Sequence, residues 1–234
     1  KLSGRARLLL PPNSQALPPL RMDMSLPYTL SRVGSEIDPL RIAVFISGGG
    51  SGLGALLKFQ NKIPRSHQTV LVISDDPNAG GQIYCGQNDV TFVGIRLPNI
   101  PEKSLRRLTH EEKIEVKLAE FNVELIVLSG YMRILTPSFV KKWKGRLVNI
   151  HPSLLPKYPG AHAHRDALAD SATVSGCTVH LVDEGVDEGL ILASEVVEVL
   201  PNDTISDLQN RIKIIEHKLY PQIIDDLCSG KIQL

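Results

Sequence analysis

Short apolar runs recur along most of the chain and alternate with stretches of mixed polarity. Their aliphatic and β-branched side chains are typical of strands that are buried on both faces of a sheet. The runs lie at residues 42–47, 70–74, 125–128, 146–150, 177–183 and 190–200. Because helix-like segments separate them, the pattern predicts an α/β fold with an open, mostly parallel sheet and flanking helices.

Three other segments have the apolar spacing of amphipathic helices. One follows the first run, at residues 53–57. A second covers residues 109–121, where Thr109 is expected to be the N-cap. The last helix is predicted to begin at Asp203 or Thr204, because apolar residues then recur at steps of three and four.

Residues 1–40 differ in composition from the rest of the chain. Six of the 16 prolines fall here, and four basic residues precede the first acidic one, Asp23. Proline-rich sequence without periodicity is typical of linkers, whereas a basic, acid-poor start is also found in organellar transit segments. Since the prolines interrupt any amphipathic spacing, we favour a flexible linker or leader that is dispensable. The folded domain is then predicted to cover residues 41–234.

Composition narrows the class of protein further. The chain has 234 residues, of which 42% are hydrophobic, and its formal net charge is +1. The balanced charge argues against nucleic acid or a membrane surface as a partner, and the longest unbroken apolar run, at residues 42–46, is too short to span a bilayer. Three widely spaced cysteines fit neither a disulfide framework nor a zinc site. We therefore predict a cytoplasmic location and no metal.

A glycine-rich turn, SGGGSG at residues 47–52, joins the first predicted strand to the first helix. Backbone N–H groups in such a turn can approach an anion, and the helix N-terminus adds partial positive charge. A phosphate site is one interpretation. A tight turn that needs positive φ values, without a ligand, is the other. The G-x-G-x-x-G pattern and the Walker lysine are both missing, so the turn alone leaves both interpretations open.

Asn149 and His151 lie at the end of the fourth predicted strand. Residues two apart on a strand point to the same side, and ligands of open α/β sheets bind at the carboxyl ends of strands. An amide and an imidazole there could donate to an oxygen that becomes negative during acyl transfer. The alternative is a capped turn with a surface histidine.

Four carboxylates fall within residues 183–188, in the loop after the strand that carries His180. A solvated loop is one interpretation, and a carboxylate that stabilises the imidazolium form of His151 is the other. His180 itself is interpreted as a hydrogen-bonded core histidine. Lys213 and Glu216 lie three residues apart on the final helix, which is typical of an ordinary ion pair.

Residues 147–160, LVNIHPSLLPKYPG, resemble the signature of the folate-dependent formyltransferases. Supporting segments follow the order of that family: IAVFISGGGSG at 42–52, LSGYMRIL at 128–135, GCTVHLVDEGVDEG at 176–189 and EHKLYP at 216–221. The resemblance covers about residues 41–234 and implies a Rossmann-like formyltransferase domain there. It implies transfer of a formyl group from 10-formyltetrahydrofolate, as cosubstrate, to the amine of glycinamide ribonucleotide in purine biosynthesis. It also implies that the chain is either free-standing or fused to other purine-biosynthesis domains.

The resemblance assigns catalytic positions to Asn149, His151 and Asp187. The first two would donate to the oxyanion that forms when the amine attacks the formyl carbon, and Asp187 would keep His151 protonated and help to move a proton. The phosphate and ribose would be held by Gly50, Ser51, Gly52, Lys213 and Glu216. The folate would be bound by Met132, Arg133, Ile134 and Leu135, with Arg133 on a tail carboxylate, and by the loop of Asp183, Glu184, Gly185 and Val186.

Two residues depart from the family pattern. Gly52 stands where the family usually has asparagine, and Glu188 stands where it usually has a small residue. Gly52→Asn is therefore expected to tighten ribonucleotide binding.

Three rival functions stay open. A formyltetrahydrofolate deformylase would use water as acceptor but generally carries an N-terminal regulatory domain. A methionyl-tRNA formyltransferase needs a C-terminal RNA-binding domain. A non-catalytic nucleotide-binding homologue would not need the three catalytic residue types.

Overall fold

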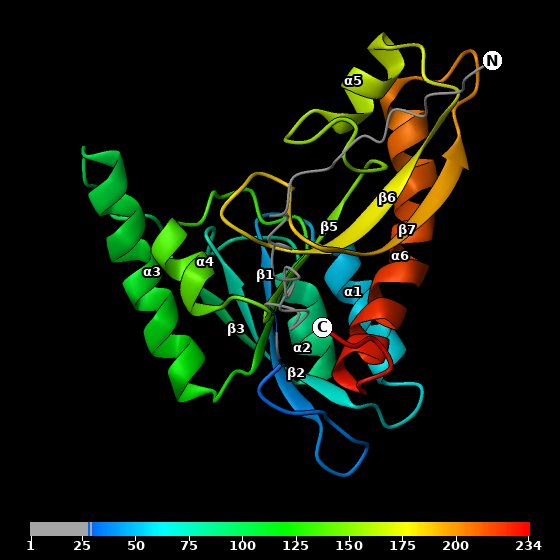
Figure 1. Cartoon of the computed structure of the whole chain (residues 1–234). Coiled ribbons are helices and arrows are strands. Elements are labelled where there is room, and N and C mark those ends of the chain that lie inside the picture. The colour runs from blue at the N-terminus through cyan, green and yellow to red at the C-terminus, as the bar shows by residue number, and fades with distance from the viewer. Residues whose placement is uncertain (1–27, 29) are drawn as a thin grey trace, which may run out of the picture.

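A seven-stranded sheet with the order β3-β2-β1-β4-β5-β6-β7 organises the protein in this computed structural model, which describes Tyr28 and residues 30–234 (Figure 1). Five strands are parallel: β1 (Leu40–Ile46), β2 (His67–Ser74), β3 (Thr91–Gly94), β4 (Leu125–Leu128) and β5 (Leu147–His151). At the other edge, β6 (Val174–Leu181) is antiparallel to β5, and β7 (Ile191–Glu198) is antiparallel to β6. The predicted α/β class with an open, mostly parallel sheet is confirmed.

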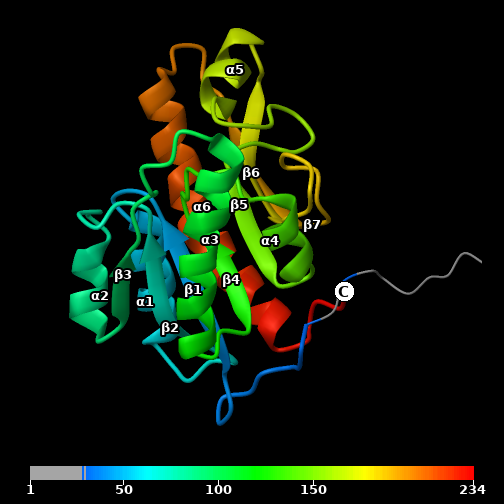
Figure 2. The same ribbon diagram turned by 90° about the vertical axis from the view of Figure 1, so that its left-hand side faces the viewer.

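Helices cover both faces of the sheet. They are α1 (Ser51–Gln60), α2 (Gln82–Asn88), α3 (Lys103–Glu120), α4 (Pro137–Lys142), α5 (Ala163–Ala169) and α6 (Ile205–Cys228). Alternate residues of β1 separate two cores: Val44 packs in the cluster that includes α1 and α6, and Phe45 packs in the cluster that includes α3 and α4. Figure 2 looks onto the α3 and α4 face. None of the helices in residues 30–234 combines the length and apolar composition that crossing a membrane requires.

The predicted helix boundaries are right at α6 and wrong at α3. Thr204 caps α6, and its hydroxyl and Asp207 form a reciprocal capping box. In contrast, α3 begins at Lys103, and its N-cap is Glu102 rather than Thr109. Its first turns, KSLRRL, are largely polar and exposed, so the apolar pattern there is too weak to reveal the true start. Strand β3 and the short helices α2, α4 and α5 were not predicted for the same reason: four to seven residues give little periodicity.

Part of the proposed linker, residues 30–39, contacts the folded domain. Arg32 binds both carboxylate oxygens of Glu124, with Nε at 2.7 Å from Oε1 and a terminal nitrogen at 2.9 Å from Oε2. The Gly34 N–H donates to the carbonyl of Cys228 (2.8 Å) at the end of α6. The remaining part of the linker prediction, residues 1–27 and 29, lies outside the described residues.

These contacts narrow the expected dispensable segment to residues 1–27. Deletion of residues 1–39 should lower the Tm relative to deletion of residues 1–27, since it removes the bidentate ion pair of Arg32 and the backbone hydrogen bond of Gly34. Thermal melting of both truncations tests this expectation, and equal Tm values would contradict it.

Candidate functional site

The predicted site residues gather at the carboxyl edge of β1, β4 and β5. Strands β1 and β4 are neighbours, although β2 and β3 intervene in sequence, so a topological switch point lies between them. Crevices at such points are where open α/β sheets bind ligands. A cavity of about 410 Å³ opens here, between the 48–52 loop and one face of α6.

The glycine-rich loop forms the N-terminus of α1 and faces this cavity. Its N-cap, Gly50, has left-handed backbone angles (φ 65°, ψ 28°), and a Cβ there would lie 2.7 Å from the Cα of Gly81. Only glycine combines that conformation with that close approach. No side chain caps the helix and its first turn holds no acidic residue. Backbone N–H groups of the first turn therefore remain without a side-chain cap, as an anion site requires.

The opposite wall of the cavity comes from α6. Lys213 and Glu216 line it together with His217, whose Nε2 lies 3.3 Å from the Ser51 hydroxyl. Burial raises the pKa of Glu216 to about 7, although the Lys213 ammonium acts in the opposite direction. Burial, assisted by Lys213, also lowers the pKa of His217. The cavity thus presents an ammonium and helix N–H groups to an anion and a carboxylate to hydroxyl groups.

The raised pKa of Glu216 predicts a pH-dependent stability. A carboxyl group whose folded pKa lies above its unfolded value of 4.5 favours the folded state at low pH, and that advantage is lost as pH rises toward about 7. Glu216→Gln should therefore match the wild type at pH 4.5 and exceed its stability by about 2 kcal/mol at pH 8, a value reduced for partial solvent exposure. Melting curves of the ligand-free proteins across this range test the expectation. A difference that does not change with pH would contradict it.

The three predicted catalytic residues meet around one carboxylate. Asp187 Oδ2 lies 3.2 Å from His151 Nδ1, and Asp187 Oδ1 lies 3.5 Å from His180 Nε2. Asn149 is paired with His180 across β5 and β6, and its Nδ2 lies 3.2 Å from His180 Nε2. The other ring nitrogen of His151, Nε2, donates to the carbonyl of Tyr158 (2.8 Å).

Asp187 is held in its ionised form by these neighbours. Burial alone would raise its pKa, but hydrogen bonds from His180 and the Gly160 N–H (2.8 Å), together with the charge of His151, lower it overall. Its backbone is left-handed, with φ 56°. His151 lies between two acceptors, with Asp187 Oδ2 3.2 Å from its Nδ1 and the Tyr158 carbonyl 2.8 Å from its Nε2.

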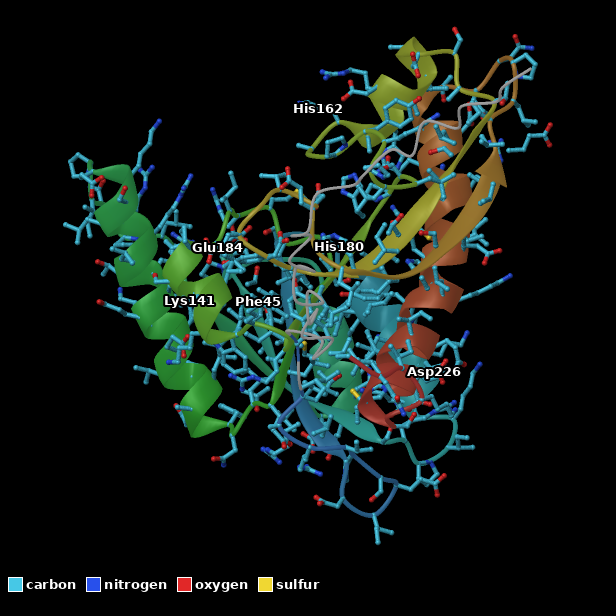
Figure 3. The ribbon with its side chains drawn as sticks, in the orientation of Figure 1. Phe45, Lys141, His162, His180, Glu184 and Asp226 are labelled. Carbon is cyan, nitrogen blue, oxygen red and sulfur yellow. The ribbon has the colours of Figure 1, made fainter. Side chains whose placement is uncertain are left out.

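His180 is a site residue that the sequence interpretation missed. It is 1% exposed, as expected of a core histidine, but it contacts both Asn149 and Asp187. Its Nδ1–H donates to the carbonyl of Leu181 (2.9 Å), while its Nε2 faces both the Asn149 amide and the Asp187 carboxylate. Figure 3 shows His180 near the loop that carries Glu184, with His162 apart, near α5. No local pattern in the sequence marks this contact, because it arises from the antiparallel pairing of β5 with β6.

A second cavity, of about 190 Å³, is lined by Asn149 and Asp187. Its walls include most of the residues predicted to bind folate: Arg133, Ile134, Leu135, Asp183, Glu184, Gly185 and Val186. Met132 instead lines the first cavity, and its N–H donates to the Ser47 hydroxyl (2.8 Å). Arg133 Nε lies 2.5 Å from Asp75 Oδ2, so only its terminal nitrogens remain available for a further carboxylate. The polar centre formed by Asn149, His151 and Asp187 thus borders this smaller, largely apolar cavity, while Ile150 and Pro152, on either side of His151, line the larger one.

Comparison with known proteins places this geometry in a family. A family model described as formyl transferase matches residues 40–224. The trifunctional purine biosynthetic protein adenosine-3 of Homo sapiens is 40% identical over 195 residues, which are 83% of this chain and 19% of that protein. This chain therefore spans about a fifth of the length of that relative. The phosphoribosylglycinamide formyltransferase of Haemophilus influenzae is 34% identical, with 83% of this chain and 90% of that protein covered.

Solved structures agree with the sequence comparison. The glycinamide ribonucleotide transformylase 1 of Symbiobacterium toebii superposes with a TM-score of 0.77 at 36% identity, over 84% of this chain and 91% of that one. The phosphoribosylglycinamide formyltransferase of Brucella melitensis gives 0.75 at 38% identity, over 83% and 98%. The family model and the sheet order agree with these structural similarities, and the chain belongs to the formyl transferase family.

Proposed function

We propose that this chain transfers the formyl group of 10-formyltetrahydrofolate to the amine of glycinamide ribonucleotide. The observation that carries the proposal is the cluster of Asn149, His151 and Asp187, which borders the smaller of two cavities of different chemistry and is next in sequence to residues that line the larger one. The larger one offers helix N–H groups and Lys213 to a phosphate. The smaller one offers apolar walls and loop backbone to a flat pterin.

Different residues of the site serve different steps of the reaction. The substrate amine attacks the formyl carbon, a tetrahedral oxyanion forms, and the bond from that carbon to the folate nitrogen then breaks. Asn149 is placed to donate to the oxyanion, because only one of its two amide hydrogens is needed for His180. Donation from His151 to the same oxygen requires its Nε2–H to exchange the Tyr158 carbonyl for the substrate oxygen.

Proton transfer falls to Asp187 and His151. The attacking amine must lose a proton and the departing folate nitrogen must gain one, so the net reaction moves one proton across the site. The ionised Asp187 can accept it directly or through water, while the neighbouring imidazolium stabilises the negative charge. Arg133 completes the folate site by pairing with a tail carboxylate through its terminal nitrogens.

The proposal also concerns whether the domain acts alone or as part of a longer protein. Relatives include both the trifunctional human protein and the Haemophilus influenzae enzyme, of which this chain covers 90%. We infer that the domain at residues 41–234 is able to act in either context. The cytoplasmic location remains a prediction from the cysteine pattern.

The proposal is tested by whether folate release depends on the amine. Tetrahydrofolate formation from 10-formyltetrahydrofolate should be negligible without glycinamide ribonucleotide and should become saturable when it is added. Release at the same rate without the ribonucleotide would favour a deformylase instead. No release under either condition would favour a non-catalytic homologue.

A further inference from the structure

Gly52, the second residue of α1, has a close neighbour from a distant part of the chain. A Cβ added at this position would lie closer than 3.0 Å to the hydroxyl oxygen of Ser129, a separation that real Cβ atoms essentially never show. Ser129 follows β4 and is anchored there, since its backbone N–H donates to the carbonyl of Phe45 (2.9 Å) on β1. The Ser129 hydroxyl therefore lies almost where a side chain at residue 52 would begin.

The Ser129 hydroxyl faces the same cavity as the glycine-rich loop. Ser129, Gly50, Ser51 and Gly52 all line it, and Ser129 is half-buried. Within residues 30–234, the Oγ of Ser129 makes no hydrogen bond, although the residue lines the cavity. By contrast, Ser47 accepts from the Met132 N–H, and Ser51 lies 3.3 Å from His217 Nε2. Ser129 thus offers the anion cavity a hydroxyl with no competing partner in the described chain.

We propose that Ser129 is a phosphate-binding residue of this site and supplies the side-chain donor that Gly52 lacks. The inference rests on the proposed function, because it takes the cavity to hold the ribonucleotide phosphate. A hydroxyl beside uncapped helix N–H groups adds a directional hydrogen bond to a charged oxygen. The glycine is required at residue 52 because any larger residue would displace that hydroxyl.

This assignment reverses the expectation for Gly52→Asn. The sequence alone predicts tighter binding, on the assumption of free space beside residue 52. In the structure that space holds the Ser129 hydroxyl, so Gly52→Asn on its own should weaken ribonucleotide binding. Combined with Ser129→Ala, which clears the space, the asparagine should regain affinity relative to Ser129→Ala alone. The two substitutions should therefore be strongly non-additive.

Calorimetric titration with glycinamide ribonucleotide and with its dephosphorylated riboside, in the absence of folate, tests the assignment. Ser129→Ala should raise the Kd for the ribonucleotide about 10-fold, as expected for loss of a hydrogen bond to a charged group. The Kd for the riboside should not change, and the KM for folate should stay within about 2-fold. Ser206→Ala, an exposed serine on α6 outside the cavity, is the matched control.

The outcomes separate this inference from the proposed function. A wild type that binds the ribonucleotide, with a Ser129→Ala variant of equal affinity and unchanged Tm, would overturn the role of Ser129 alone. Equal weakening of ribonucleotide and riboside by Ser129→Ala would also overturn it, since the phosphate would then not be the group contacted. A wild type that fails to bind the ribonucleotide at all would overturn the proposed function.

Discussion

Replacing Asp187 with asparagine should reduce turnover by at least about 100-fold, the effect expected for loss of a proton-transfer group. The carboxylate lies 3.2 Å from His151 Nδ1 and 3.5 Å from His180 Nε2, and its pKa is held below the usual value. The fold should persist, because asparagine tolerates the left-handed backbone (φ 56°) and its amide oxygen can still accept from the Gly160 N–H. Steady-state kcat and thermal melting of the variant measure the two effects.

Asp183→Asn is the matched control for Asp187→Asn. Asp183 lies in the same loop, but its Oδ1 accepts from the Gly185 N–H (3.0 Å), and no histidine of the described chain is paired with it. Its replacement should alter folate binding at most and leave kcat within about 10-fold, since the group lies outside the proton path. Equal losses of kcat at both positions would show that Asp187 has no special part in proton transfer.

Replacing Asn149 with alanine should lower kcat by about 10²–10³-fold, the range found when one donor to an oxyanion is removed. The amide of Asn149 is oriented by its contact with His180, and Asn149 borders the smaller cavity. Because the interaction strengthens as the oxyanion forms, the loss should fall on kcat more than on either KM.

The control for Asn149→Ala is Asn202→Ala, an exposed asparagine in the turn before α6. It should leave all kinetic constants unchanged. A loss below about 10-fold for Asn149→Ala, or one confined to KM, would remove this side chain from the oxyanion site.

Most of the sheet could be predicted from local pattern, and the parts that were missed have a common cause. Strands such as β1 and β4 are buried on both faces, so their apolar runs are unmistakable. Edge strand β3 has four partly exposed residues. The start of α3 depends on the Glu102 carboxylate capping a polar, exposed turn, and no apolar period marks it.

The individual residues of the candidate site could be predicted from the sequence, but the contacts between them could not. The motif resemblance named Asn149, His151 and Asp187, but it could not reveal that His180 joins Asn149 to Asp187. That contact depends on the pairing of β5 with β6. The proximity of Gly52 and Ser129 is similarly invisible, because it arises only when β1 and β4 lie side by side and α1 follows from the first of them.

The fate of the formyl carbon tests the central claim most directly. The wild-type protein would be incubated with 10-formyltetrahydrofolate labelled with ¹³C in the formyl group and with glycinamide ribonucleotide, and the products would be followed by ¹³C NMR. Our account predicts that the label appears as the N-formyl carbon of the ribonucleotide, in equal amount to the tetrahydrofolate released, and that Asp187→Asn slows both together. Label that accumulates instead as formate, at a rate unaffected by the ribonucleotide, would contradict it.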